Sequence, residues 1–195
     1  MKRISLLFLG TILAFACSSP KTESTSEAEM DHSQHEALAD TTKAKPKSPI
    51  TSAMAMVDGN HIHIDYSSPS VRGRQIFGGL VAFGEVWSTG AHKATSIQYE
   101  KPVTINGTPI PAGKYGFFTI PGQTEWTLIL NQVWDMHLAD DYDASKDLVR
   151  IQVNPETLPE TVESLTYSVE ETSPGTAKIS VAWDKTKVSF EAINQ

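Results

Sequence analysis

From residue 50 onward, apolar side chains recur at every second position within short runs of the chain. A period of two residues places alternate side chains on opposite faces of a strand, so each run has one buried and one solvated face. We therefore expect residues 50–195 to form one all-β domain, an antiparallel β-sandwich of the immunoglobulin-like or jelly-roll-like kind, with Trp126 and Trp183 in its core. The clearest runs are Leu165, Tyr167 and Val169; Ile179, Val181 and Trp183; and Val188 with Phe190.

Turn signals divide this region into strands. Asp58-Gly59 and Asn106-Gly107 favour tight hairpin turns, and each lies between two apolar runs. Residues 71–89 contain too many glycines for a regular strand and predict a long loop, a segment that often carries function on a sandwich. Residues 140–147 predict a polar loop or a capped helical turn. The expected strands cover residues 54–57, 62–64, 95–99, 103–105, 109–110, 115–120, 126–130, 148–153, 165–169, 177–183 and 188–190.

The N-terminal residues have the pattern of an export signal. Lys2 and Arg3 precede an apolar stretch, residues 4–16, that is too short for a stable membrane anchor. Ala16-Cys17 resembles a bacterial lipoprotein cleavage site, so residues 1–16 are expected to be a signal peptide and Cys17 the lipid attachment site. The alternative is an ordinary secreted protein with a free thiol, which an oxidising compartment disfavours. We expect a lipid-anchored protein of the bacterial cell envelope, at the outer membrane or its periplasmic face.

Residues 17–49 are polar and contain almost no aliphatic bulk. Such a segment cannot bury enough apolar surface to offset the entropy of ordering, so it predicts a disordered tether between lipid and domain. The net charge of −7 argues against nucleic acid as a partner. Because Cys17 is the only cysteine, the domain has no internal disulfide.

Two histidines occupy alternate positions of an expected strand. His61 and His63 alternate with Ile62 and Ile64, so both imidazoles should project from the outer face if the isoleucines face the core. Imidazoles two residues apart on one strand face can chelate a transition metal. The alternative is that both are solvated polar residues of an exposed sheet. Further soft or borderline ligands in this region are Met54, Met56, His92, Met136 and His137.

The tether holds a second group of metal-ligating residues. Met30, His32 and His35 lie within a few residues of one another, and short histidine-rich tracts are typical of metal binding. The tract resembles the methionine- and histidine-rich segments of bacterial copper-resistance proteins; solvated linker composition is the alternative. Copper is the expected ion because methionine sulfur suits Cu(I) and imidazole suits both oxidation states. A blue-copper centre is not expected, since Cys17 is assigned to the lipid.

Several motifs occur after residue 50: YSSPSVRGRQIFGGLV (66–81), GEVW (84–87), TGA (89–91), PAGKY (111–115), FTIPG (118–122), EWT (125–127) and WDKTKV (183–188). Together they resemble those of a bacterial family called domain of unknown function 2911. The resemblance implies an exported β-rich domain, often from Bacteroidota, and supplies neither a substrate nor catalytic residues. The chain departs from the family pattern at His92, where the family has asparagine.

Three classes of function remain in contention. The first is a non-catalytic envelope binding protein that takes copper or another transition metal. The second is an adhesion or assembly module for a glycan or another envelope protein. The third is an enzyme with an unrecognised loop site at Arg72, Arg74, Glu85 and His92. Arg72 and Arg74 can grip a carboxylate or phosphate, or can instead pin the glycine-rich loop. The chain has no nucleophile elbow and no phosphate-binding glycine loop, which disfavours an enzyme.

Overall fold

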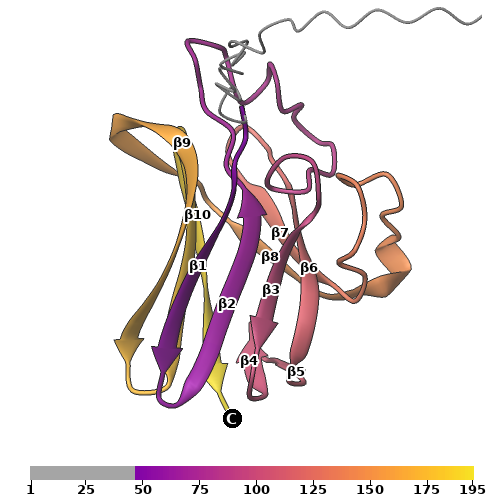
Figure 1. Ribbon diagram of the computed structural model, residues 1–195, viewed down its shortest axis with the longest axis vertical. Coiled ribbons are helices and arrows are strands. Elements are labelled where there is room, and N and C mark those ends of the chain that lie inside the picture. Colours follow the sequence, from indigo (N-terminus) through magenta and orange to yellow (C-terminus); the bar gives the residue numbers. More distant parts are fainter. Residues whose placement is uncertain (1–46) are drawn as a thin grey trace, which may run out of the picture. The chain divides into compact units, whose positions relative to one another are not determined.

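The computed structural model describes residues 47–195, which form two antiparallel β-sheets packed face to face (Figure 1). The predicted all-β sandwich is therefore confirmed. The described residues contain no helix with the length and hydropathy that a membrane span requires. The predicted signal peptide and nearly all of the predicted tether, residues 1–46, lie outside the described part of the chain.

The larger sheet has six strands in the order β1-β2-β3-β6-β7-β8. The predicted hairpin at Asp58-Gly59 is present and joins β1 to β2. Residues 68–94, between β2 and β3, form no strand, so the predicted long loop is confirmed; we call them the long loop. The strands are β1 (Ile50–Val57), β2 (Asn60–Ser67), β3 (Thr95–Tyr99), β6 (Gly113–Ile120), β7 (Trp126–Asn131) and β8 (Asp147–Val153).

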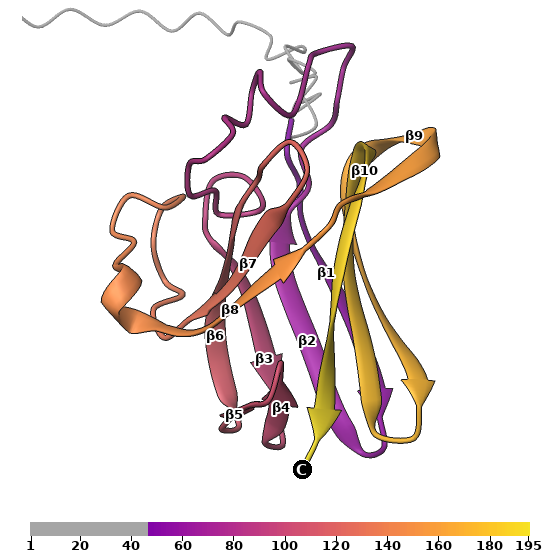
Figure 2. The ribbon, with the colours of Figure 1, turned by 180° about the vertical axis from the view of Figure 1, so that it is seen from behind.

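The smaller sheet has four strands in the order β5-β4-β10-β9 and includes the predicted hairpin at Asn106-Gly107. Its bounds are β4 (Val103–Ile105), β5 (Thr108–Ile110), β9 (Glu156–Ser173) and β10 (Thr176–Asn194), and β9 and β10 form a long bent ribbon (Figure 2). The prediction of two strands at 177–183 and 188–190 is wrong, because β10 runs through both. Register shifts around Asp184, which has φ of 54°, bend the strand without ending it.

The main core lies between the two sheets. Ile62 and Ile64 of β2 are fully buried, and the predicted core anchors Trp126 and Trp183 are 3% and 2% exposed. The long loop adds Phe77 and Trp87 to these indoles: the Trp87 ring stacks on Trp183 at 5.8 Å, and Phe77 meets Trp126 edge-on at 4.8 Å. The loop is therefore packed into the sandwich by aromatic contacts rather than lying free on its surface.

A second, smaller core covers part of the outer face of the six-stranded sheet. Phe118 and Ile129 point away from the main core, yet they are 0% and 1% exposed. The segment between β7 and β8 covers them with Met136 and Tyr142, whose ring lies 5.1 Å from that of Phe118. Sequence alternation alone assigns this face to solvent, and the covering segment explains the difference.

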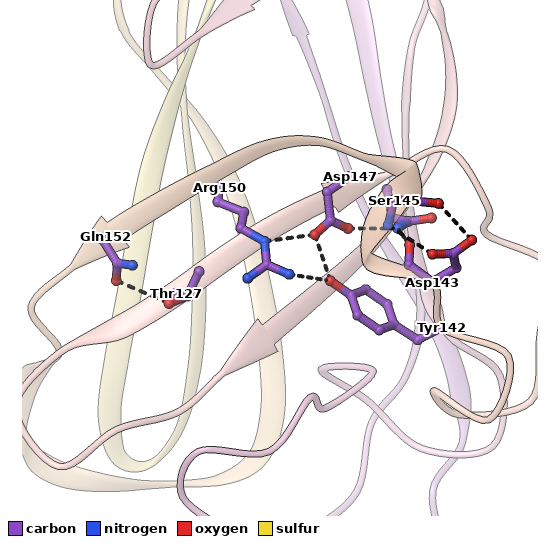
Figure 3. Close-up of polar contacts among 8 residues, drawn as sticks. Thr127, Tyr142, Asp143, Ser145, Asp147, Arg150 and Gln152 are labelled. Carbon is purple, nitrogen blue, oxygen red and sulfur yellow. Dashed lines mark hydrogen bonds and ion pairs between the residues drawn. The ribbon is translucent and has the colours of Figure 1, made fainter.

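A polar network fixes the covering segment (Figure 3). The Asp147 carboxylate accepts hydrogen bonds from the Tyr142 hydroxyl and Arg150 Nε, both at 2.7 Å. Burial, together with this bond to Asp147, raises the pKa of Tyr142 to about 12. Asp143 accepts from the Ser145 amide and caps a short 3₁₀ turn, Ala144–Lys146, so the predicted capped turn is confirmed. These carboxylates are therefore engaged in holding the segment in place.

Candidate functional site

The β1–β2 hairpin sets two methionines directly opposite two histidines. Asp58 and Gly59 both have positive φ, 44° and 70°, as a tight two-residue hairpin turn requires. A turn of this length fixes the register, which pairs Met54 with His63 and Met56 with His61. Side chains paired in this way share one face of the sheet, with Cβ atoms about 4.5–5.5 Å apart. We call this group of four side chains the Met–His face.

The Met–His face is open to solvent. Ile62 and Ile64, which alternate with the two histidines along β2, are fully buried. The predicted outward projection of both imidazoles is therefore confirmed. The His61 and His63 side chains are 31% and 27% exposed. Met54 and Met56 are 55% and 61% exposed. Four soft or borderline donors are thus accessible on one surface.

Each imidazole of the Met–His face contacts a carboxylate through one ring nitrogen. Nε2 of His63 lies 2.8 Å from Asp65 Oδ1, and Nδ1 of His61 lies 3.4 Å from Glu100 Oε1. Metal-binding histidines in proteins commonly hold a carboxylate on the nitrogen that does not bind the metal. The two ring centroids are 5.8 Å apart. Rings that share one metal at about 2.0–2.1 Å per nitrogen have centroids roughly 5–6 Å apart, so the observed spacing is compatible with a common ion.

Asp65 connects the Met–His face to a neighbouring aromatic. Lys114 Nζ lies 2.9 Å from Asp65 Oδ2 and 4.5 Å from the centre of the Trp134 ring. Burial raises the pKa of Asp65, but hydrogen bonds from Lys114 and His63 outweigh it and hold the pKa below its ordinary value. Asp65 is therefore ionised at neutral pH and orients the His63 ring.

The other predicted metal ligands of the domain lie elsewhere. His92 is exposed on the long loop, and His137 hydrogen-bonds Asp140 through Nδ1 at 2.8 Å. Met136 is 5% exposed and belongs to the second core. Within residues 47–195, no three side chains among His, Cys, Asp and Glu are grouped so as to hold a metal ion. The remaining predicted residues, Cys17, Met30, His32 and His35, lie outside the described residues.

The two arginines of the long loop contact backbone carbonyls. Arg72 Nη2 donates to Lys47 O at 2.8 Å, while Arg74 donates through Nε to Val71 O at 3.1 Å and through Nη2 to Ser70 O at 2.6 Å. These bonds correspond to the structural alternative, in which the arginines pin the loop. Arg74 also lines a cavity, and Arg72 is not among the cavity's lining residues.

The cavity, of about 420 Å³, lies under the long loop, and we call it the Trp87 cavity. Trp183 of β10 is 2% exposed and so lies at its floor, while Arg74 and Glu85 are exposed and form part of its rim. Apolar side chains of the loop, including Leu80, supply its walls. Sequence reasoning missed this cavity, because Trp87 and Trp183 are far apart in the chain and only the glycine-rich loop signalled an unusual segment.

Two indole nitrogens of the Trp87 cavity differ in their hydrogen bonding. Trp87 Nε1 donates to Gly90 O at 3.1 Å. Trp183 Nε1 is buried and has no hydrogen-bond partner among the described residues. A buried N–H without an acceptor is costly, and such groups are rare in folded proteins.

Comparison with known proteins assigns the domain to a family. The motifs noted above, from residue 66 to residue 188, all lie within the two sheets and their connecting loops. Neither the curated proteins nor the solved structures contain a match. A family model described as "Protein of unknown function (DUF2911)" matches residues 48–192, which is nearly all of the described sandwich. The chain therefore belongs to the domain of unknown function 2911 family.

Proposed function

We propose that this protein is a copper-binding protein of the bacterial cell envelope, and that the Met–His face is its binding site in the domain. The observation that carries the proposal is the hairpin register, which sets Met54 against His63 and Met56 against His61 on an exposed surface. Two thioethers and two imidazoles within one strand pair form a complete four-donor set. The proposed role is binding and transfer of the ion rather than catalysis.

The donor set favours copper over other metals. Thioether sulfur is a soft ligand that suits Cu(I), whereas calcium and magnesium take oxygen ligands and structural zinc sites use thiolate and imidazole. Imidazole suits Cu(I) and Cu(II), so the face would retain the ion in either state, with Cu(I) bound more tightly. The exposure of Met54 and Met56 supports exchange with a partner, since an ion held there is within reach of another protein's ligands.

The N-terminal region supports a place for this function in the envelope. The proposed lipid at Cys17 holds the domain at a membrane, and the tether carries Met30, His32 and His35 as a second donor group. A tether of this length brings its donors to the domain at high effective concentration, so it can deliver copper to the Met–His face or receive it. Binding of a glycan or another envelope protein is the alternative role for the sandwich.

The proposal is tested by competing the full chain against a chromogenic Cu(I) chelator under anaerobic conditions. Replacing Met54 and Met56 together by leucine removes both sulfurs while preserving apolar volume on an exposed surface, so the fold should be unaffected. We expect Cu(I) affinity at the domain to fall by about tenfold or more, the equivalent of roughly 1.4 kcal/mol. Replacing His61 and His63 together by asparagine should weaken the binding of both Cu(I) and Cu(II).

The matched controls replace residues of the same types outside the Met–His face. Met136→Leu exchanges a buried methionine, and His137→Asn exchanges an exposed histidine. Both should leave copper affinity unchanged. A separate chain with Met30→Leu, His32→Asn and His35→Asn isolates the contribution of the tether. The Met54 and Met56 substitutions are then repeated in this tether variant. If they leave its copper affinity unchanged, the Met–His face is not a copper site.

A further inference from the structure

The Trp87 cavity has the chemistry of a binding site that is independent of copper. Its volume of about 420 Å³ falls in the range of pockets that hold small organic ligands. Most of its lining comes from the long loop, with Ser48, Leu138 and Trp183 added from outside it, and none of it belongs to the Met–His face. The aromatic contacts of Trp87 and Phe77 hold the loop against the core, so the cavity is preformed.

Arg74 supplies a hydrogen-bond donor at the rim of the Trp87 cavity. Trp183 Nε1 is buried out of reach of solvent, so Trp183 contributes apolar surface to the floor and no donor. Arg74 lies at the rim, where its bonds to Ser70 O and Val71 O fix the guanidinium. A guanidinium held in place in this way is complementary to a carboxylate, which accepts charge-assisted hydrogen bonds from it.

The rim also carries a negative charge. Glu85 lines the cavity and is exposed, and no ion pair between Arg74 and Glu85 is present in the described part of the chain. Opposite charges that line one cavity without pairing are complementary to a ligand that carries both an anion and a cation. The walls between them are apolar, with Leu80, Val81 and Val86 beside the Trp87 ring.

We propose that the Trp87 cavity binds a small zwitterion with an apolar body, of the amino-acid class. The carboxylate is directed to Arg74, the ammonium to Glu85, and the apolar side chain lies against Val86 and Trp87. The two charges give specificity, because a ligand lacking either one leaves a rim residue unsatisfied, while the walls contribute through burial of apolar area.

The test uses three related probes on the full chain. L-leucine carries both charges, leucinamide lacks the carboxylate, and N-acetyl-leucine lacks the ammonium. Because Trp87 and Trp183 both line the cavity, binding should change the intrinsic tryptophan fluorescence, and isothermal titration gives the affinity. We expect leucine to bind and each of the other two to bind about tenfold or more weakly, as loss of a charge-assisted contact predicts.

Variants locate the binding. Arg74→Ala and Glu85→Gln should each weaken leucine binding by about tenfold. Arg72→Asn is the matched control: it removes a cation from the same loop but outside the cavity, and asparagine tolerates the φ of 52° at that position. Trp183→Phe alters only the apolar floor, so it should weaken binding less than either rim substitution, with the unfolding midpoint measured beside it.

Three outcomes would overturn the proposal. The first is no binding of leucine at millimolar concentration by unaltered protein. The second is equal binding of all three probes, which would indicate an apolar pocket without charge recognition. The third is binding that survives Arg74→Ala and Glu85→Gln together. Binding of a neutral oligosaccharide in place of leucine would likewise reassign the cavity to a glycan.

Discussion

Two buried tyrosines of the sandwich provide a matched test of how the long loop is held. Tyr167 of β9 is 4% exposed, and its hydroxyl donates to Thr89 O at 2.9 Å. Tyr99 of β3 is 1% exposed, and its hydroxyl has no partner among the described residues. Replacing each tyrosine by phenylalanine is therefore the same chemical change at two equally buried positions, with and without a hydrogen bond.

Only the substitution that removes a hydrogen bond is expected to destabilise the protein. Tyr167→Phe removes one buried hydrogen bond and leaves the Thr89 carbonyl with one donor, the Thr95 hydroxyl at 3.0 Å. We therefore expect the free energy of unfolding to fall by about 1 kcal/mol. Tyr99→Phe removes a hydroxyl that is desolvated and unbonded, so stability should stay constant or rise by up to about 1 kcal/mol. The two variants should thus differ by about 1–2 kcal/mol, or roughly 2–8 °C in Tm for a domain of this size.

Urea unfolding at pH 7, followed by tryptophan fluorescence, measures both effects. Burial raises the pKa of Tyr99 and of Tyr167, so both phenols are neutral and the comparison involves no change of charge. The m-values should match that of the unaltered protein, since neither change alters the area exposed on unfolding. Equal losses in the two variants, or a larger loss for Tyr99→Phe, would refute the assignment of Tyr167 as the residue that ties Thr89 to β9.

Three further predictions concern backbone packing and ionisation. Gly116→Ala places a Cβ against the Val133 carbonyl oxygen, so thermal unfolding should show a loss of about 1–3 kcal/mol in the free energy of unfolding. The pKa of Asp65 is lowered in the folded state, so the Asp65 carboxylate stabilises the fold at pH values above its ordinary pKa of about 4. This stabilisation is lost as the pH falls below that value. Asp65→Asn should therefore lower the free energy of unfolding by less than about 1 kcal/mol at pH 7, because solvent screens this partly exposed carboxylate. In strong acid the substitution should have no effect, and urea unfolding at several pH values measures both. The pKa of Tyr142 is raised to about 12, so its neutral hydroxyl stabilises the fold fully below pH 10. This stabilisation is lost as the pH rises through 12. Asp147→Asn should move the Tyr142 midpoint down toward 10 in an ultraviolet titration.

The strands of the sandwich were predictable where their signals are local. The β1–β2 hairpin follows from Asp58-Gly59 and from the alternation on either side of it, and both signals lie within a few residues. The continuity of β10 through Asp184 was not predictable, because a bulge keeps polar residues such as Lys185 within a strand. The second core was also missed, since the segment that covers Phe118 arrives from a separate part of the chain.

The two candidate sites were predictable to different degrees. The outward projection of His61 and His63 follows from strand parity alone. The two-residue turn also fixes their pairing with Met56 and Met54, so the whole Met–His face could be predicted from the sequence. The Trp87 cavity required the tertiary contact between Trp87 and Trp183, for which no local pattern exists.

The position of each site in the fold decides how its variants should behave. Met54 and Met56 are more than half exposed, so leucine there should change stability by less than about 0.5 kcal/mol whatever it does to copper. Trp183 is a core residue, so its replacement must change stability as well as ligand binding. Loss of copper affinity with no loss of stability therefore identifies the Met–His face as a ligand set. Loss of both together would instead mean that the substitution had disturbed the hairpin itself.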